Sequence, residues 1–127
     1  WQQARIAASP PQAGVVERVE RIARTLPIGI LTNNGTLMAQ TIPRILPTLA
    51  PMLEGRILCS GELGGRKPDR AVFLSAVERL DARPARTLFV DDLFVNVRGA
   101  RLAGLHADTA NDSRSFGKLM HRFGIDA

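Results

Sequence analysis

Hydrophobic positions along the chain alternate between helix-like spacing and short continuous runs. From residue 15 to residue 26 the apolar residues recur every three or four positions, which predicts a helix with one buried face. Pro27 ends this pattern, and the run IGILT at 28–32 predicts a buried strand. The alternation continues to the C-terminus. Further strands are expected at RILCS, TLFVD and LHADTA (56–60, 87–91 and 105–110), and further helices at 36–46, 68–80, 93–104 and 113–123.

This order of elements predicts the fold class. Helices of this length between successive strands favour parallel βαβ units, and strands that are apolar almost throughout are typical of a sheet covered on both faces. We therefore predict an α/β fold, a doubly wound parallel sheet with helices on both faces.

Length and composition restrict the class of protein. A chain of 127 residues that is 45% apolar suits one domain with a real core. The single cysteine, Cys59, excludes an intrachain disulfide, and its position in an apolar strand suggests a small buried hydrophobe rather than a nucleophile. No apolar stretch approaches the roughly 20 residues of a membrane span, and the N-terminus does not resemble a signal peptide. We expect a cytoplasmic protein with no membrane partner.

The formal net charge of +5 could indicate a nucleic-acid partner. The basic residues are dispersed, however, and in segments such as 17–21 they alternate with acids, as on a solvated helix face. No aromatic residues are interleaved with them for base stacking. Nucleic acid is therefore not an expected partner.

Unusual polar residues follow several of the predicted strands. Thr32 and Asn33 end the first one, Lys67 lies in the glycine-rich loop after the second, and Asp91 and Asp92 end the third. The carboxyl ends of parallel strands meet at one edge of a sheet, where ligands bind. A hydroxyl, a lysine and two carboxylates at one edge suit phosphoryl transfer, because Mg²⁺ takes carboxylates together with a substrate phosphate and lysine neutralises phosphate charge.

Each of these residues also has a purely structural interpretation. Thr32 could be a helix N-cap or strand-end hydroxyl, Lys67 a solvated loop lysine, and the aspartate pair a cap for the helix that begins at Leu93. Their shared order and placement favour a site. His106 and His121 have no ligand-spaced partners, so surface or core roles are expected for both.

Three segments resemble the second, third and fourth signatures of the haloacid dehalogenase superfamily. They are ILTNNG (30–35), GELGGRKPD (61–69) and LFVDDLFVNVRGARLAGLHA (88–107), and the resemblance covers roughly residues 15–110. It implies that Thr32 binds the transferring phosphoryl group with Asn33 beside it, and that Lys67 is the signature lysine, which also contacts substrate.

The fourth signature carries the implied metal site. By the resemblance, Asp91 and Asp92 hold Mg²⁺ as cofactor, with Asp92 as the inner-sphere ligand and Asn96 supporting the pair. Relatives that cleave carbon–halogen bonds usually have serine and asparagine at the paired positions and need no metal. The two aspartates therefore imply a Mg²⁺-dependent phosphatase acting on a small phosphorylated metabolite, through an aspartyl phosphate formed by an N-terminal aspartate. A second aspartate two residues later would be the general acid and base. A catalytically inactive binding module and a 2-haloacid dehalogenase are the alternatives.

The first signature of the superfamily, an apolar strand followed by Asp-x-Asp, does not occur before Thr32. We expect residues 1–14 to be a linker or the end of a cap region, residues 15–127 to be a partial core domain, and the central strand of the sheet to be missing. The chain would then be the C-terminal portion of a longer protein, or would receive the strand from another segment. Alone it should be inactive, and its unpaired central strands would favour association, including homo-oligomers.

Overall fold

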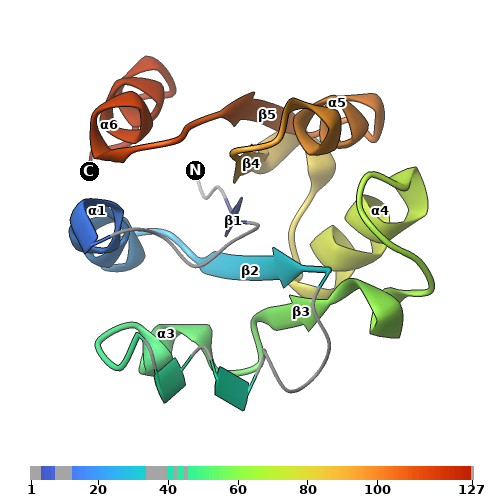
Figure 1. The fold of residues 1–127 in the computed structure, drawn as a ribbon, viewed down its shortest axis with the longest axis horizontal. Helices are drawn as coiled ribbons and strands as arrows, with labels where there is room; N and C mark the ends of the chain where they lie inside the picture. Colours follow the sequence, from blue (N-terminus) through green and yellow to red (C-terminus); the bar gives the residue numbers. More distant parts are fainter. Residues whose placement is uncertain (1–3, 8–12, 34–39, 42, 45, 127) are drawn as a thin grey trace.

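A parallel five-stranded sheet forms the centre of the molecule, with strand order β3-β2-β1-β4-β5 (Figure 1). The computed structural model describes residues 4–7, 13–33, 40–41, 43–44 and 46–126. The strands are β1 (Ala4–Ala7), β2 (Ile28–Thr32), β3 (Ile57–Cys59), β4 (Thr87–Asp91) and β5 (His106–Thr109). Every neighbouring pair is parallel. The predicted α/β class with a parallel sheet is confirmed.

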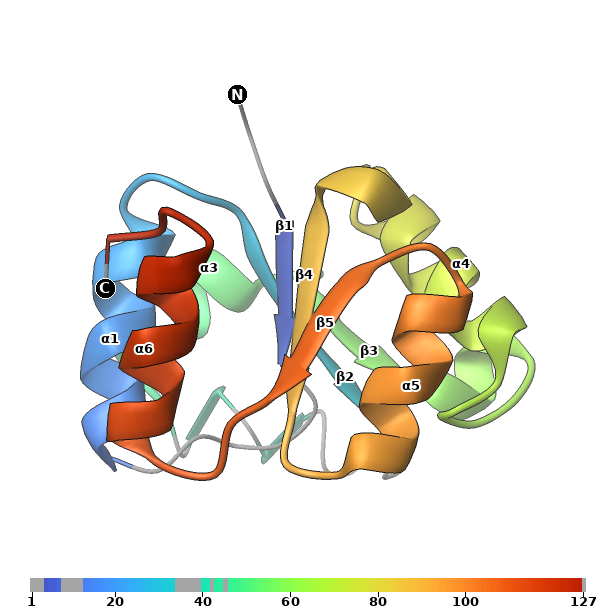
Figure 2. The ribbon, with the colours of Figure 1, turned by 90° about the horizontal axis from the view of Figure 1, so that it is seen from above.

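Helices cover both faces of this sheet. They are α1 (Ala13–Ala23), α3 (Ala50–Leu53), α4 (Arg70–Arg79), α5 (Phe94–Leu102) and α6 (Ser113–Arg122), with the 3₁₀ turns η1 (Ser60–Leu63) and η2 (Pro84–Arg86). Helices α1, α3 and α6 lie on one face, and α4 and α5 lie on the other (Figure 2). The helix expected at 36–46 falls largely outside the described residues. None of the helices within the described part of the chain is long and apolar enough to cross a membrane.

Two apolar cores result from this double coverage. Consecutive residues of β4 point to opposite faces, so Leu88 packs against α1 and α6 while Phe89 packs against α4 and α5. Both side chains are fully buried, and the Phe89 ring meets the ring of Phe73 edge to face with centroids 5.0 Å apart. This arrangement explains why β2, β3 and β4 carry apolar residues at consecutive positions rather than at alternate ones.

The expectation of a missing central strand is wrong for this structure. β1 lies between β2 and β4, and its residue Ile6 is in register with Gly29 on one side and Phe89 on the other. Residues 4–7 therefore belong to the sheet, not to a linker, and helix α1 begins at Ala13. Because β2 and β4 both have a parallel partner, the predicted association through unpaired central strands loses its physical basis.

Candidate active site

Residues from three different segments lie at the carboxyl edge of the sheet. Thr32 is the last residue of β2, Asp91 is the last residue of β4, and Lys67 lies in the loop between η1 and α4. All three side chains are buried, whereas Asp92, the next residue after β4, is exposed. The structure thus gathers at one edge the polar residues that the sequence places at strand ends.

A buried ion pair joins two of these residues. The Lys67 Nζ lies 3.4 Å from Asp91 Oδ2, and the two side chains are 5% and 1% exposed. Asn96 of α5 donates to the same carboxylate oxygen from its Nδ2, at 2.9 Å. The other oxygen of Asp91 accepts from the backbone N–H of Leu93 at 3.1 Å, just before α5 begins. Helix α5 has no side-chain cap hydrogen bond, so the alternative interpretation of the aspartate pair as a helix cap is not borne out.

Asn33 holds the backbone of the lysine. Its Oδ1 accepts from the N–H of Lys67 at 2.9 Å, and its Nδ2 donates to the carbonyl of the same residue at 3.4 Å. Both bonds fix the point from which the Lys67 side chain leaves the loop. Sequence reasoning placed Asn33 beside the phosphoryl group and did not find this contact with the lysine.

Gly99 of α5 lies against the same loop, next to Pro68. A Cβ at Gly99 would lie 2.4 Å from the carbonyl oxygen of Pro68 and 2.7 Å from its Cβ, which is closer than real Cβ contacts. Only glycine therefore allows α5 to lie this close to the residue that follows Lys67. The sequence signal for this contact was an otherwise unexplained glycine inside a predicted helix.

The electrostatics of the site follow from burial and from these contacts. Burial lowers the pKa of Lys67, and the carboxylates of Asp91 and Asp92 oppose this shift. Burial by itself would raise the pKa of Asp91, but a hydrogen bond with Asp92, the charge of Lys67 and the donors Leu93 and Asn96 together lower it. The pKa of Asp92 is raised by its hydrogen bond with Asp91, by burial and by the like charge of that neighbour. Two adjacent carboxylates therefore disfavour a second negative charge, and a cation would relieve this.

The donor set fits a hard divalent cation. Within the described residues, no three His, Cys, Asp or Glu side chains form a group that could hold a metal ion by themselves. Asp91 and Asp92 provide carboxylate oxygens from adjacent positions, and Mg²⁺ is commonly bound by one or two carboxylates with water and a substrate phosphate completing its shell. These two residues would hold the ion.

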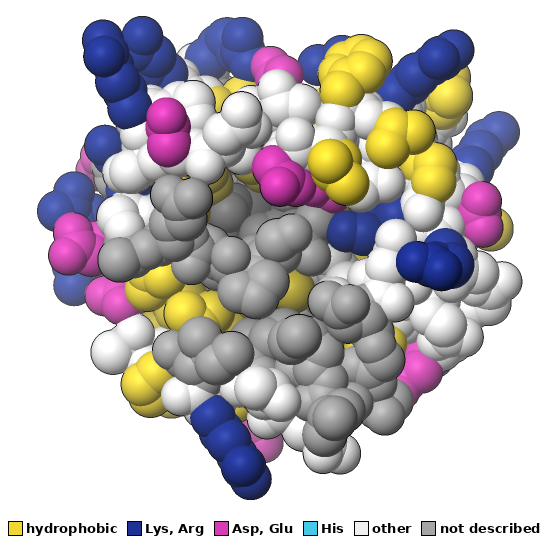
Figure 3. All heavy atoms as spheres, in the orientation of Figure 1, with side chains coloured by type: hydrophobic (Ala, Val, Ile, Leu, Met, Phe, Trp, Pro, Cys, Tyr) yellow, Lys and Arg dark blue, Asp and Glu magenta, His cyan; other side chains and the backbone are white. Residues whose placement is uncertain are grey.

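Exposed apolar side chains flank the aspartates. Leu93, Phe94 and Val95 are each more than half exposed, and Figure 3 shows hydrophobic side chains on the surface over α5, beside acidic ones. They follow Asp92 directly in the chain, so the exposed carboxylate has exposed apolar neighbours.

Other sequence predictions outside the site are confirmed. Cys59 is buried in β3, and burial raises the pKa of its thiol, as expected of a structural cysteine rather than a nucleophile. His106 and His121 are both exposed, which agrees with a surface role.

Comparisons with known proteins agree on one family. A family model described as haloacid dehalogenase-like hydrolase matches residues 2–104. The phosphatase MT3486 of Mycobacterium tuberculosis (strain CDC 1551 / Oshkosh) is 33% identical over 84 residues, which are 66% of this chain. The chain spans only 38% of the length of that relative.

Solved structures show the same fold. An uncharacterized protein from Corynebacterium glutamicum ATCC 13032 Kitasato matches 100% of this chain and 98% of its own, with a TM-score of 0.74 and 28% identity. The 2-haloacid dehalogenase from Pseudomonas syringae pv. Tomato DC3000 has a TM-score of 0.69 at 24% identity, over 87% of this chain and 53% of its own. At this identity the dehalogenase likeness concerns the fold alone.

Proposed function

Because the chain belongs to the haloacid dehalogenase-like hydrolase family, we propose that its sheet edge is the phosphate- and magnesium-binding part of a phosphatase active site. The reaction is Mg²⁺-dependent hydrolysis of a phosphate monoester, and the substrate is a small phosphorylated metabolite in the cytoplasm. The observation that carries this proposal is the buried ion pair of Lys67 with Asp91, directly beside the exposed Asp92.

Each residue of the edge has a chemical role in this proposal. The hydroxyl of Thr32 donates to a phosphoryl oxygen, and the ammonium of Lys67 neutralises the charge that gathers on the phosphoryl group and its attacking oxygen. Asp91 and Asp92 would hold Mg²⁺, with the exposed Asp92 as the more accessible of the two ligands, while Asn96 orients Asp91 through its hydrogen bond. The metal, when bound, offsets phosphate charge and aligns the phosphoryl group for in-line attack.

The nucleophile of this chemistry is not among the residues of this chain. The first aspartate in the sequence is Asp69, and no Asp-x-Asp occurs anywhere in the 127 residues. In the proposed enzyme an aspartate attacks phosphorus, the alcohol leaves with a proton from a second aspartate, and water then cleaves the aspartyl phosphate. A strand bearing these two aspartates would have to take the place between β2 and β4 that β1 takes in this structure.

That requirement favours one alternative function, a catalytically inactive binding module. Its supporting observation is that residues 4–7 already complete the sheet without an aspartate. Such a module would still bind a phosphate group through Thr32 and Lys67 but would not hydrolyse it. A dehalogenase is less well supported. Relatives with that activity usually need no metal, whereas Asp91 and Asp92 provide the two carboxylates that suit a metal ion.

The test is hydrolysis of p-nitrophenyl phosphate by the protein purified from its native source, whose intact mass is measured on the same sample. We expect a mass above 13.8 kDa and turnover that requires Mg²⁺ and stops with EDTA. Asp92→Asn in that protein should lower kcat/KM by about a hundredfold or more, because the metal that stabilises the negative charge of the transition state would bind more weakly. Asp126→Asn, at an exposed position near the C-terminus, is the matched control. A native mass of 13.8 kDa without turnover would contradict the phosphatase and leave the binding module.

A further inference from the structure

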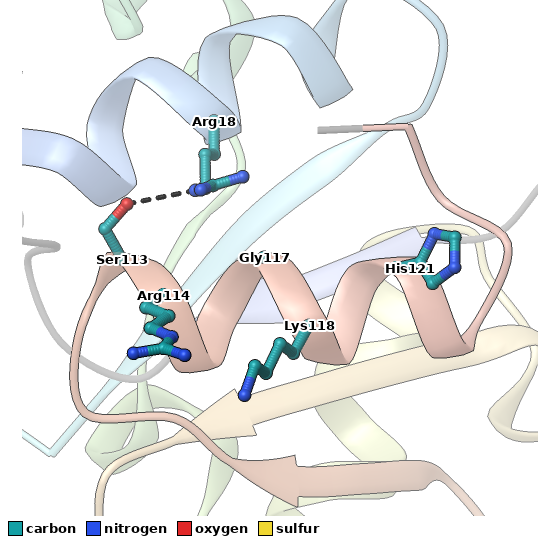
Figure 4. Close-up of a pocket in the computed structure, with 6 residues that line it drawn as sticks. All are labelled: Arg18, Ser113, Arg114, Gly117, Lys118 and His121. Atoms are coloured by element: carbon teal, nitrogen blue, oxygen red, sulfur yellow. Dashed lines mark hydrogen bonds between the residues drawn. The ribbon is translucent and has the colours of Figure 1, made fainter.

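A groove lined by basic residues lies between α1 and α6, on the face of the sheet opposite α4 and α5. Its volume is about 570 Å³. The described residues that line it are Arg18 of α1 and Ser113, Arg114, Gly117, Lys118 and His121 of α6 (Figure 4). None of these six is acidic. The groove shares no residue with the candidate active site.

The Arg18 head group is held in place against α6. Its Nε donates to Ser113 Oγ at 2.9 Å, and Figure 4 shows the side chain reaching from α1 toward α6. A Cβ at Gly117 would lie 2.6 Å from Arg18 Nη1, so the missing side chain provides the space for the guanidinium. The half-buried Arg18 is thus a fixed donor group rather than a freely moving surface arginine.

Further positive charge follows along the same helix. Arg114 and Lys118 are exposed and are four residues apart, so they lie on neighbouring turns of one face, and His121 comes one turn later. Within the described residues, no ion pair joins Arg114 or Lys118 to a carboxylate.

Two acids beside α6 have partners of their own. Asp108 pairs with Arg122 and Arg101, and Asp112 accepts from the Ser115 N–H as the N-cap of α6. Neither lines the groove. The lining itself therefore holds no carboxylate, and Arg114 interacts electrostatically with Asp112 at the start of α6.

We infer that this groove binds a small polyanion that carries two or more phosphate groups. Guanidinium and ammonium groups match phosphate oxygens through charge-assisted hydrogen bonds, and an arginine can contact two oxygens at once. The groove volume is within the roughly 300–1,000 Å³ range of small-molecule sites. Arg114 and Lys118 are about 6 Å apart along the helix axis, at about 1.5 Å per residue, and Arg18 lies across the groove on α1, so the three cations suit a chain of phosphates better than a single one.

The test is calorimetric titration of the 127-residue protein with sodium tripolyphosphate, at low salt and with EDTA to exclude magnesium. The pair Arg114→Glu with Lys118→Glu should weaken binding by at least about tenfold, because two charge-assisted contacts become repulsive. The matched control is Arg79→Glu with Arg98→Glu, which makes the same charge change on α4 and α5 and should alter affinity by less than about twofold. Gly117→Ala changes no charge but displaces the Arg18 guanidinium, so it should weaken binding by about threefold or more.

Several outcomes would overturn the inference. An equal loss in the control pair would mean that binding reflects overall charge. Binding that survives the groove variants but disappears in Lys67→Ala would place the polyanion at the sheet edge. Tighter binding of a single-stranded DNA 20-mer than of tripolyphosphate, through the same residues, would make the groove a nucleic-acid surface.

Titration with ATP beside tripolyphosphate distinguishes a nucleotide from an inorganic chain as the preferred small ligand.

Discussion

The ion pair of Lys67 and Asp91 is the feature of the site whose removal should be most costly to the fold. Lys67→Met keeps an unbranched side chain of similar length but leaves the Asp91 carboxylate, 1% exposed, without its cation. We expect the free energy of unfolding to fall by about 3 kcal/mol, because breaking a buried pair strands a charge. Urea denaturation followed by circular dichroism measures the change.

A control and a double variant make this prediction specific. Lys118→Met, at an exposed lysine, should change stability by less than about 0.5 kcal/mol. Lys67→Met combined with Asp91→Asn should recover part of the loss, because neither buried charge remains. If the single variant costs less than the exposed control, the pair contributes nothing to stability.

Individual residues of the site could be predicted from the sequence, but their contacts could not. Strand-end position and residue chemistry are sufficient to single out Thr32, Lys67 and the aspartate pair. The hydrogen bonds between the Asn33 side chain and the Lys67 backbone join positions that are 34 residues apart, and no local sequence pattern predicts them. They depend on how the loop after η1 folds back toward the end of β2, which is a property of the packed chain.

At the scale of elements, the close approach of α5 to the Lys67 loop depends on Gly99. In a helix interior, Gly→Ala normally stabilises by about 0.5–1 kcal/mol. Here the new Cβ would meet the Pro68 carbonyl at 2.4 Å, so we expect Gly99→Ala to destabilise instead, by about 1–3 kcal/mol. Thermal unfolding measures the sign.

Gly61→Ala is the control for this variant. A Cβ at Gly61 meets nothing within 4 Å, so that substitution should be close to neutral or slightly stabilising. A stabilising effect of Gly99→Ala would show that α5 and the loop are farther apart than in this structure.

Strand β5 is tied to two helices through one carboxylate. Asp108 pairs with Arg122 of α6 and with Arg101 of α5, at 3.5 Å in the latter case. Burial would raise the pKa of Asp108, but the Thr109 N–H and the two arginines lower it. A lowered folded-state pKa gives stability that is present above the ordinary aspartate value of about 3.9 and is lost as pH falls through the folded value.

Asp108→Asn should therefore reduce the free energy of unfolding by about 1 kcal/mol at pH 7, discounted for partial exposure. The difference from the unmodified protein should stay constant down to about pH 5 and close below about pH 4. Urea denaturation at a series of pH values measures it, with Asp126→Asn as the control for charge alone. A gap that does not narrow as the pH falls below about 4 would mean that the substituted amide disturbs packing rather than the ion pairs.

At the scale of the whole molecule, the sequence predicts the layers correctly but not the central strand. The sequence pattern predicts β2 to β5 and the helices α1, α4, α5 and α6, whereas α3 (Ala50–Leu53) was not predicted. The segment ARIA has only one large apolar residue and includes Arg5, so its pattern does not predict a buried strand. The segment is instead held in the sheet by pairing with β2 and β4, whose backbone groups both need a parallel partner.

Only one strand can lie between β2 and β4, and this decides between the two proposed functions. Ile6→Pro removes a backbone donor from β1 at a position in register with Gly29 and Phe89. In the 127-residue chain we expect a loss of about 1–3 kcal/mol in unfolding free energy, because a buried acceptor loses its partner. Ala4→Pro, at the first residue of the strand, is the milder control. In a longer protein whose own strand carries Asp-x-Asp, that strand displaces residues 4–7, so Ile6→Pro should leave both stability and phosphatase turnover unchanged. The same substitution would be damaging in a binding module, where residues 4–7 remain the central strand.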